Sequence, residues 1–379
     1  MADDVTRDQK LMGVFVALAV LAVSAAGAGA ALDRSQVDVV SRDVPVGPDG
    51  RLTVQFLGDT MLGDEVQNLI DQRGQGYDWP FDATRPAVTA DYTIANAEGP
   101  VSEHTAPWNP AKKYSYTSRP ESAGAIARSG IDAVTLANNH AYDAGPEGLA
   151  DTMRHFDAVG IPSIGAGPDI ARAEQPLLLR TAAGTVGVIS IGESFGHRAA
   201  GDQGGTLVLS PEAVLRGAAM ARTAGADWVI AAVHWGGNYA QIDPAQREFA
   251  RVFADAGYDM VVGTGPHTTQ QIEFVGSMPV FYSIGNYVFG TPGRWATNNA
   301  RGLGLSVELE LSRDQPARIA MRCLVTDNMV INFQPRLCSA PEAQAFLPTL
   351  SAHLAMEGDV AILRCDGCFA RRNESSGRS

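Results

Sequence analysis

Residues 131–141 read IDAVTLANNHA, an apolar run that ends in two amides and an imidazole. The run from Ile131 to Leu136 predicts a buried strand. In an open α/β sheet, ligands bind at the carboxyl ends of the strands. Asn139 can supply an oxygen ligand for a metal, and His140 a nitrogen that moves protons. These residues predict a functional site if other strand ends supply the rest of it.

Strands alternate with helices on both sides of this segment, which predicts an α/β fold with a largely parallel sheet covered by helices. After residue 302 the pattern changes to two strands at a sheet edge, 303–311 and 318–325, and a helix over 341–356. The earlier strands are expected at 52–57, 91–95, 131–136, 185–191, 228–233, 260–263 and 279–284, and the helices at 65–73, 120–129, 146–159, 211–223 and 244–256.

The composition is that of a globular protein. The chain has 379 residues, of which 45% are hydrophobic and 19% charged, and a formal net charge of −13. A chain of this length can bury a large core. The acidic balance, without a basic stripe interleaved with aromatic residues, argues against a nucleic-acid partner.

Residues 11–32 (LMGVFVALAVLAVSAAGAGAAL) are apolar or small and carry no charge. A helix of roughly 20 such residues spans a bilayer core of about 30 Å. It can be an uncleaved membrane anchor, or a signal peptide cleaved in the small-residue segment 26–30. Both alternatives place the rest of the chain outside the cytoplasm, anchored to the cell membrane or secreted.

The same pattern divides the chain into four parts. Residues 1–34 form a cytoplasmic stub plus the signal peptide or anchor, and 35–50 a polar linker. The main domain is expected over 51–334, and 335–379 as a C-terminal appendage with a tail.

All four cysteines fall near the end of the chain, at positions 323, 338, 365 and 368. In an exported protein an even number suggests disulfides, with three possible connectivities, rather than a redox or zinc motif.

Other predicted strands also end in residues that can bind a metal. Asp59 follows the first strand and Glu98 the second, while His234 and His267 follow two later ones. Each alone is equally well explained as a turn, a helix cap or a core histidine. Together with Asn139 they form a mixed oxygen and nitrogen set suited to Mn, Zn or Fe. Two such ions close together would activate a water for attack on a phosphate ester.

Five ordered motifs between about residues 52 and 289 resemble the bacterial capsule-synthesis protein CapA family, also called the poly-γ-glutamate biosynthesis family. That family is similar to the calcineurin-like metallophosphoesterases. The motifs are FLGDTMLG at 56–63, NAE at 96–98, LANNHAYDAG at 136–145, HWG at 234–236 and PVFYSIGNYVF at 279–289.

The resemblance implies a metallophosphoesterase-like four-layer sandwich, in which helices flank two packed β-sheets and one or two divalent metal ions lie at the strand ends. Asp59 and His267 would bind the first metal, and Glu98 would bridge the two. Asn139 and His234 would serve the second metal.

The resemblance also implies roles around the metals. His140 would be the catalytic proton donor to a leaving oxygen, which suits an imidazole near neutral pH. Lys112 and Lys113 lie where the family has a basic residue and would bind an anionic substrate, together with Asn138. These cations would offset the repulsion from the net charge of −13.

Two departures from the family pattern bear on catalysis. The family has Gly-x-His-Pro-His where this chain has Gly263-Thr264-Gly265-Pro266-His267, so Gly265 replaces a ligand of the second metal. Asp64 stands where an arginine is common, and it can compensate as a ligand.

Three functions remain open at this point. The first is a membrane-associated role in the biosynthesis or export of capsule or poly-γ-glutamate, an anionic surface polymer, beside the subunits that synthesise it. The second is a metal-dependent phosphoesterase-type hydrolase acting on an envelope substrate. The third is a catalytically degenerate binding module, so whether the protein is an enzyme stays open.

Overall fold

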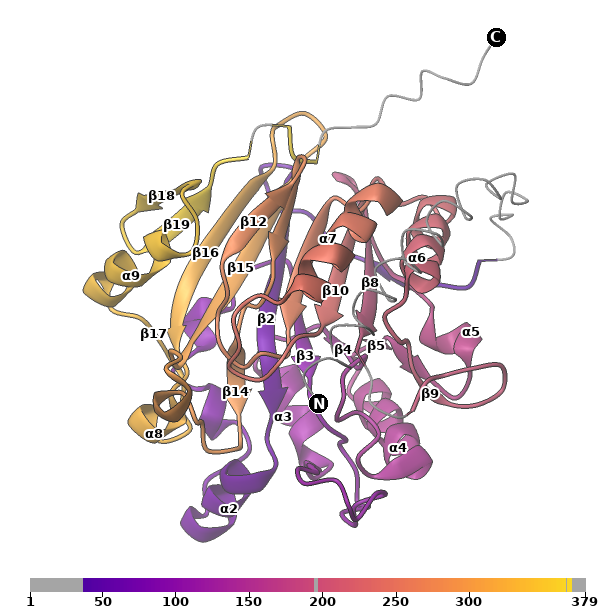
Figure 1. Ribbon diagram of the computed structural model, residues 1–379, viewed down its shortest axis with the longest axis vertical. Coiled ribbons are helices and arrows are strands. Elements are labelled where there is room, and N and C mark those ends of the chain that lie inside the picture. The colour runs from indigo at the N-terminus through magenta and orange to yellow at the C-terminus, as the bar shows by residue number, and fades with distance from the viewer. Residues whose placement is uncertain (1–36, 194–196, 366, 370–379) are drawn as a thin grey trace, which may run out of the picture.

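The computed structural model describes residues 37–193, 197–365 and 367–369, which form a mixed α/β fold with two large sheets (Figure 1). One sheet has seven strands, and its central members run parallel. Its order is β1 (Val40–Asp43), β7 (Leu177–Thr181), β8 (Gly184–Gly192), β10 (Trp228–His234), β11 (Met260–Thr264), β13 (Met278–Phe281) and β12 (Ile272–Val275).

The second sheet has ten strands and is parallel on one side of β2 and antiparallel on the other. A separate short pair joins β6 (Ala166–Gly167) to β9 (Gly205–Thr206). The main path of the large sheet is β18 (Leu354–Glu357), β19 (Val360–Leu363), β16 (Arg318–Val325), β15 (Leu303–Leu311), β2 (Leu52–Met61), β3 (Tyr92–Ala97), β4 (Ala133–Thr135) and β5 (Ser163–Ile164), with β14 (Asn286–Phe289) paired to β2 and β17 (Arg336–Leu337) to β16.

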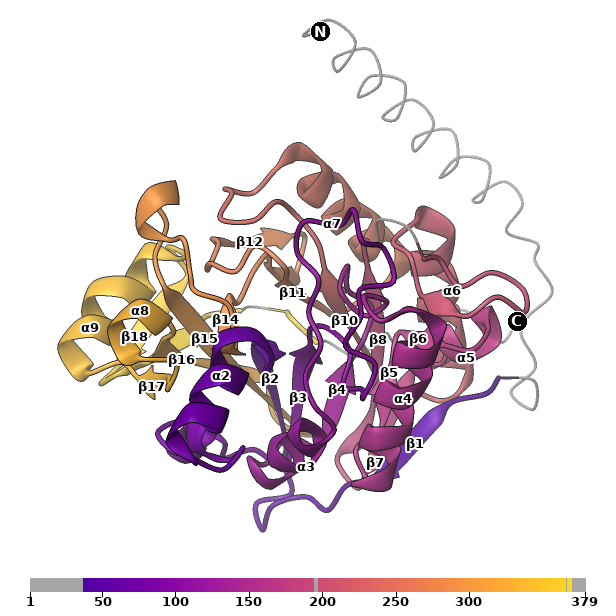
Figure 2. The same cartoon turned by 90° about the horizontal axis from the view of Figure 1, so that it is seen from below.

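Helices cover the outer face of each sheet (Figure 2). Apolar residues of α2 (Asp64–Arg73), α3 (Glu121–Arg128) and α4 (Gly145–Ala158) pack on the ten-stranded sheet. Those of α6 (Pro211–Thr223) and α7 (Pro244–Ala256) pack on the seven-stranded sheet. The remaining helices are short: α5 (Ile170–Ala173), α8 (Asn328–Ile331), α9 (Ala340–Phe346) and the 3-10 turns Trp79–Phe81, Arg85–Ala87, Ala296–Asn298 and Leu347–Thr349.

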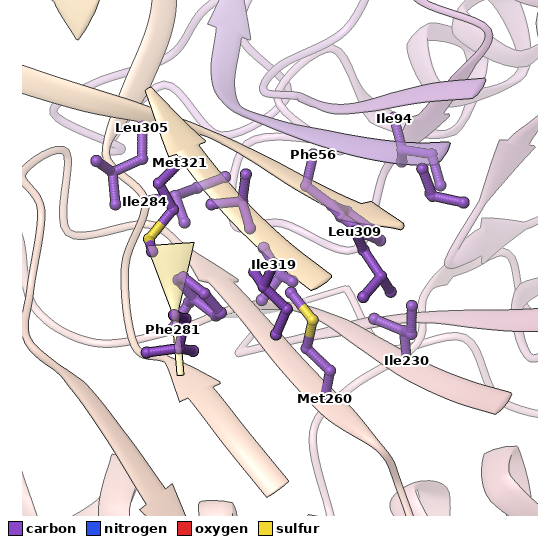
Figure 3. Packing of buried hydrophobic residues seen from close by; sticks show 14 of the residues in the cluster. Phe56, Ile94, Ile230, Met260, Phe281, Ile284, Leu305, Leu309, Ile319 and Met321 are labelled. Atoms are coloured by element: carbon purple, nitrogen blue, oxygen red, sulfur yellow. The ribbon is translucent and has the colours of Figure 1, made fainter. Parts of the chain in front are cut away.

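The largest apolar core lies between the two sheets (Figure 3). Phe56 on β2 and Ile94 on β3 belong to the same buried cluster as Ile230 on β10 and Met260 on β11. Side chains of a strand alternate between its two faces, and Leu52, Val54 and Phe56 of β2 accordingly belong to this core. The layers therefore run helices, sheet, sheet, helices.

A β-bulge in β2 re-aims the end of this strand. Leu57 pairs with Ala95 on β3 but Asp59 pairs with the next residue, Asn96, so Gly58 is the extra residue. A Cβ atom on Gly58 would lie 1.9 Å from the carbonyl oxygen of Gly285, so only glycine fits there. Bulges of this kind change the direction of the following side chain. Here the following side chain is that of Asp59.

Most expected elements before residue 302 are present within a few residues of their predicted bounds. Two later expectations are wrong. The strands 303–311 and 318–325 are internal, because β19 and β18 extend the sheet beyond them. The expected helix 341–356 ends after Phe346, and residues 354–357 form β18 instead. Pro348 has no backbone N–H for an α-helical hydrogen bond, so α9 gives way to the 3-10 turn Leu347–Thr349.

The structure also bears on the predicted divisions of the chain, which stay predictions. The expected linker 35–50 contains β1, which pairs with β7. The expected appendage contributes the β18–β19 hairpin to the ten-stranded sheet. Disulfides join Cys323 to Cys338 and Cys365 to Cys368.

The predicted anchor or signal peptide, 11–32, lies outside the described residues. Within the described ranges, every helix is too short or too polar to cross a membrane.

Candidate metal centre

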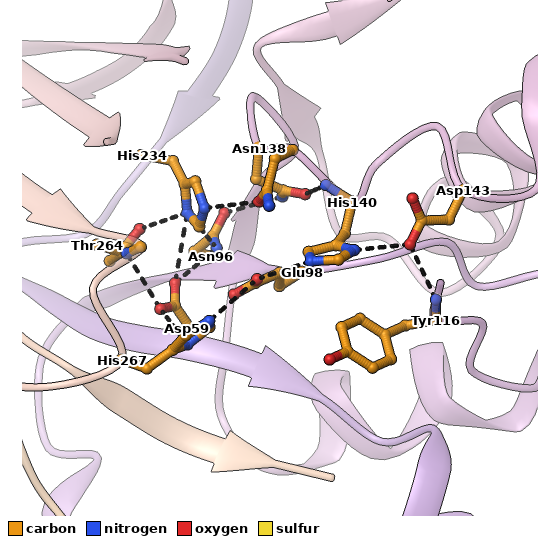
Figure 4. Close-up of polar contacts among 12 residues, drawn as sticks. Asp59, Asn96, Glu98, Tyr116, Asn138, His140, Asp143, His234, Thr264 and His267 are labelled. Carbon is orange, nitrogen blue, oxygen red and sulfur yellow. Dashed lines mark hydrogen bonds and ion pairs between the residues drawn. The ribbon is translucent and has the colours of Figure 1, made fainter. Parts of the chain in front are cut away.

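Both sheets contribute side chains to one buried polar cluster (Figure 4). The ten-stranded sheet supplies Asp59 at the end of β2 and Glu98 just after β3. The seven-stranded sheet supplies His234 at the end of β10 and His267 in the loop after β11. The structure thus brings together the four residues that were expected at these strand ends.

Asp59 is fully buried and lies at the centre of the cluster. Its Oδ1 accepts a hydrogen bond from Asn96 Nδ2 at 2.8 Å, and its Oδ2 one from the backbone N–H of Gly265 at 3.1 Å. His234 Nδ1 lies 3.6 Å from Oδ1 and His267 Nδ1 3.4 Å from Oδ2. Burial alone raises the pKa of Asp59, but its hydrogen bonds to His234 and His267 outweigh this and hold the pKa well below its usual range. Asp59 is therefore ionised.

Glu98 is the least satisfied group in the cluster. Its side chain is buried, yet within the described part of the chain neither carboxylate oxygen has a hydrogen-bond partner. The nearest ring nitrogens are Nε2 of His267 at 3.7 Å and Nε2 of His140 at 3.8 Å from Oε1. Burial, and then the charge of Asp59, raise the pKa of Glu98. A buried carboxylate without partners is costly unless a cation compensates it.

Asp59, Glu98 and His267, which we call the metal cluster, satisfy the geometric requirement for a metal site. One ligand atom from each lies within 4.8 Å of the others. His267 has a positive φ of 56°, and its Nδ1 lies 2.9 Å from Oδ1 of Asn286. Two carboxylates and one imidazole suit Mn, Zn or Fe. The unsatisfied oxygens of Glu98 fit the same conclusion, that a divalent cation belongs here.

The predicted ligands of a second metal lie next to this group but bind each other. His234 Nε2 lies 2.9 Å from Oδ1 of Asn139, and its Nδ1 lies 3.1 Å from Oγ1 of Thr264. Burial lowers the pKa of His234, but the hydrogen bond to Asp59 and the charge of Glu98 reverse this and raise it. A second ion would have to replace the contact between Asn139 and His234.

Gly265 is adapted to its position. It has a φ of 111°, a backbone conformation that residues with a side chain rarely adopt. A Cβ atom there would lie 2.7 Å from the backbone oxygen of Trp235 and 3.2 Å from Nε2 of His234. The side chain of a histidine at 265 would lie close to His234, an expected ligand of the second metal, but it would strain the backbone.

His140 is held by an acid and lies over the metal cluster. Its Nδ1 lies 2.7 Å from Oδ2 of Asp143, which leaves Nε2 directed towards Glu98. Asp143 also accepts from the backbone N–H of Tyr116 at 2.9 Å and forms an ion pair with Lys112. An acid that orients a histidine is the arrangement used for general acid–base catalysis.

The three residues predicted to bind substrate have different surroundings. Lys112 is half-buried and bonded to Asp143 and to the backbone oxygen of Asn139. Asn138 is buried, and its amide bridges Asn96 and the backbone N–H of His140. Lys113 is exposed, with Nζ 5.0 Å from the ring centre of Tyr114. Their role in substrate binding stays a prediction.

Asp64 has no place in the cluster. It is exposed at the first position of α2, so it does not replace the missing ligand near Gly265.

Residues 53–291, well over half of the chain, match the family described as bacterial capsule synthesis protein PGA_cap. The chain belongs to this family. The match covers every residue of the metal cluster and the His140–Asp143 pair. It confirms the resemblance inferred from the five sequence motifs.

Curated relatives agree with this assignment. The PGA biosynthesis protein CapA of Bacillus subtilis is 32% identical over 248 residues, which are 64% of this chain and 64% of that protein. The capsule biosynthesis protein CapA of Bacillus anthracis is 30% identical over 248 residues, 63% of this chain and 60% of its own. A probable polyglutamine synthesis accessory protein of Mycobacterium tuberculosis is 28% identical over 282 residues, 62% and 74% of the two chains. The chain thus spans less than two thirds of the two CapA proteins.

Solved structures resemble this PGA_cap protein only distantly. The sulfate thiohydrolase SoxB of Thermus thermophilus aligns with a TM-score of 0.41 and 13% identity, over 83% of this chain and 63% of that one. The protein TT1561 of Thermus thermophilus aligns with a TM-score of 0.39 and 12% identity, over 68% and 93%.

Several residues that support this candidate site were not evident from the sequence. Asn96 and Asn286 fix Asp59 and His267, and Asp143 fixes His140. All three lie inside the motifs at 96–98, 136–145 and 279–289, so their positions were a usable signal. Tyr116, whose ring lies 4.5 Å from that of His140, stands outside every motif.

We expect Glu98→Gln to abolish metal binding, because the amide removes the unsatisfied anionic oxygens. Excess Mn²⁺, at a hundred times its Kd, stabilises the wild-type fold by about 2.7 kcal/mol in urea unfolding. Glu98→Gln loses this gain, while its metal-free form is at least as stable as wild type, because one of two adjacent buried carboxylates is gone. Asp143→Asn is the matched control and keeps the gain. A full Mn²⁺ effect in Glu98→Gln would contradict the assignment.

Metal affinity is expected to rise with pH. Burial lowers the pKa of His267, but the charges of Glu98 and Asp59 overcome this and raise the pKa to about 9 in the metal-free protein. Below this pKa the ring is protonated, and a metal must displace the proton before it binds. Calorimetric titration with Mn²⁺ should therefore show affinity increasing by up to about tenfold per unit between pH 6 and 8, with proton release. An affinity independent of pH would exclude His267 as a ligand.

Proposed function

We propose that this protein serves the biosynthesis or export of an anionic surface polymer of the capsule or poly-γ-glutamate type, and that its chemical contribution is metal-dependent hydrolysis. The support for the biological role is membership of the PGA_cap family. The observation that carries the chemistry is the buried group of Asp59, Glu98 and His267 beside the His140–Asp143 pair. The substrate class we propose is a phosphate ester in the cell envelope.

The fold and location form part of the proposal. We assign the layers of helices, sheet, sheet and helices to the metallophosphoesterase type, because the candidate ligands follow strand ends of both sheets. We assign residues 1–34 to a membrane anchor or signal peptide, which puts the catalytic face outside the cytoplasm. Polymer-synthesis subunits in the membrane are then the natural partners.

We propose that one divalent ion is held tightly, by Asp59, Glu98 and His267. When bound, the ion would polarise a phosphoryl oxygen and lower the pKa of a bound water. Two observations support one ion rather than two. The side chains of Asn139 and His234, the expected ligands of a second ion, already bond to each other. Gly265 supplies no side-chain ligand beside them.

The chain's own residues supply the proton. His140 presents Nε2 to the cluster, and Asp143 accepts a hydrogen bond from Nδ1, which fixes the orientation of the ring. Protonated His140 can deliver its Nε2 proton to the oxygen of the leaving group. Lys112 and the backbone N–H of Tyr116 hold the Asp143 carboxylate in place.

The proton-donor role predicts a dependence on the leaving group. His140→Ala should lower kcat by roughly 10²- to 10⁴-fold for an alkyl phosphate, whose alkoxide needs a proton. It should have much less effect with p-nitrophenyl phosphate, whose leaving group is a weak base. Steady-state kinetics with both substrates measure the difference, and exposed His104 provides a control variant, His104→Ala. An equal loss for both substrates would contradict proton donation by His140.

The biological role predicts a capsule phenotype. A strain that lacks the gene should lose surface polymer, and the wild-type gene should restore it. Glu98→Gln should fail to restore it at equal protein level if the role requires the metal. Polymer is measured chemically on washed cells. Unchanged polymer in the deletion strain would refute the role, and full restoration by Glu98→Gln would refute a need for metal chemistry within it.

A further inference from the structure

Arg294 lies at the surface beside the metal cluster, with its guanidinium held by two tyrosines. Its Cζ lies 5.3 Å from the ring centre of Tyr114 and 5.5 Å from that of Tyr239. Its Nη1 donates to the Tyr114 hydroxyl at 3.2 Å, and its backbone N–H donates to the Tyr239 hydroxyl at 3.2 Å. The two tyrosines come from segments far apart in the sequence, so the tertiary fold creates this position.

The same segment is tied to the backbone of a metal-ligand candidate. The indole N–H of Trp295 donates to the carbonyl oxygen of His267 at 2.8 Å. The backbone N–H of Tyr239 donates to Pro266 at 2.7 Å, and its ring centre lies 6.1 Å from that of His267. The Tyr239 ring thus contacts both Arg294 and His267, so the guanidinium lies one tyrosine ring away from a candidate metal ligand.

Arg294, Lys113, Tyr114 and Tyr239 form a patch whose two cations have no acidic partner in the described part of the chain. Within the described ranges, no ion pair involves Arg294 or Lys113, whereas Lys112 is paired with Asp143. Lys113 Nζ lies 5.0 Å from the other tyrosine of the patch, Tyr114. The nearby ammonium of Lys113, and then the charge of Arg294, lower the pKa of the Tyr114 hydroxyl. These two cations share one aromatic neighbour, Tyr114, so they form a local positive region that attracts anions.

We propose that Arg294, assisted by Lys113, is a second anion-binding subsite, which selects phosphate esters that carry an additional carboxylate or phosphate group near the scissile phosphate. The planar guanidinium fork matches either group with two parallel hydrogen bonds. Because the tyrosines already restrict the side chain, binding costs less conformational freedom. This inference rests on the proposed function, since it places the scissile phosphate at the metal cluster.

Binding of non-hydrolysable phosphonates tests the subsite without relying on turnover. The probes are propylphosphonate, 3-phosphonopropionate and 1,3-propanediphosphonate, titrated calorimetrically into the full 379-residue chain with Mn²⁺ present. The wild-type protein should bind at least one of the two bifunctional probes roughly tenfold more tightly than propylphosphonate. Which of them gains identifies carboxylate or phosphate as the recognised group. The gain should shrink as salt rises.

Three substitutions decide whether Arg294 is responsible. Arg294→Ala should reduce the affinity for the bifunctional probes to that for propylphosphonate, while Mn²⁺ affinity and unfolding midpoint stay at wild-type values. Arg180→Ala removes an exposed arginine on β7 and should keep the full preference, which controls for net charge. Arg294→Lys keeps the charge but loses the fork, so it should retain part of the preference.

The outcomes separate this inference from the proposed function. Equal binding of the three probes by wild type, or an unchanged preference in Arg294→Ala, would overturn the subsite even if esters are hydrolysed. An Arg294-dependent preference without hydrolysis of any phosphate ester would support the subsite and refute only the proposed hydrolysis.

Discussion

The proximity of two buried carboxylates, Asp59 and Glu98, is the constraint on which the rest of the site depends. Two negative charges in a low-dielectric interior repel each other strongly and are poorly hydrated. His234 and His267 offset part of this cost at Asp59, whereas neither oxygen of Glu98 has a hydrogen-bond partner within the described ranges. A divalent cation held by Asp59, Glu98 and His267 would offset the remaining cost.

This constraint explains why the site lies where the two sheets meet. The carboxylates come from the ten-stranded sheet, whereas His234 and His267 come from the seven-stranded sheet. The histidines neutralise Asp59 only if the apolar core between the sheets holds them in register. The bulge at Gly58 then turns Asp59 towards the other sheet, and a side chain at 58 would collide with Gly285. Packing and site chemistry are therefore coupled through the same few backbone positions.

The sequence predicted that Asp59, Glu98, His234 and His267 would lie close together, because strand ends follow from local periodicity and the topology of parallel sheets. It did not predict their partners. The bonds from Asn96 to Asp59 and from Asn286 to His267 join residues from different strands, which no local pattern encodes. The C-terminal hairpin was missed for a similar reason: β18 pairs with β19, which itself pairs with β16, and this pairing overrides the weak helical pattern after Pro348. Tertiary contacts also give Lys112 a structural partner, Asp143, that its position in a loop did not indicate.

Gly265 shows why a missing family ligand is not simply a damaged site. Its backbone N–H binds Asp59, and its φ of 111° and the nearby Trp235 oxygen leave little room for a side chain. The backbone N–H that this loop turns towards Asp59 stabilises the ionised form of the carboxylate, which is the form that can hold a cation. The glycine is thus compatible with a single metal position at Asp59, Glu98 and His267, the position that we propose, and a side chain at 265 would strain the backbone that supports it.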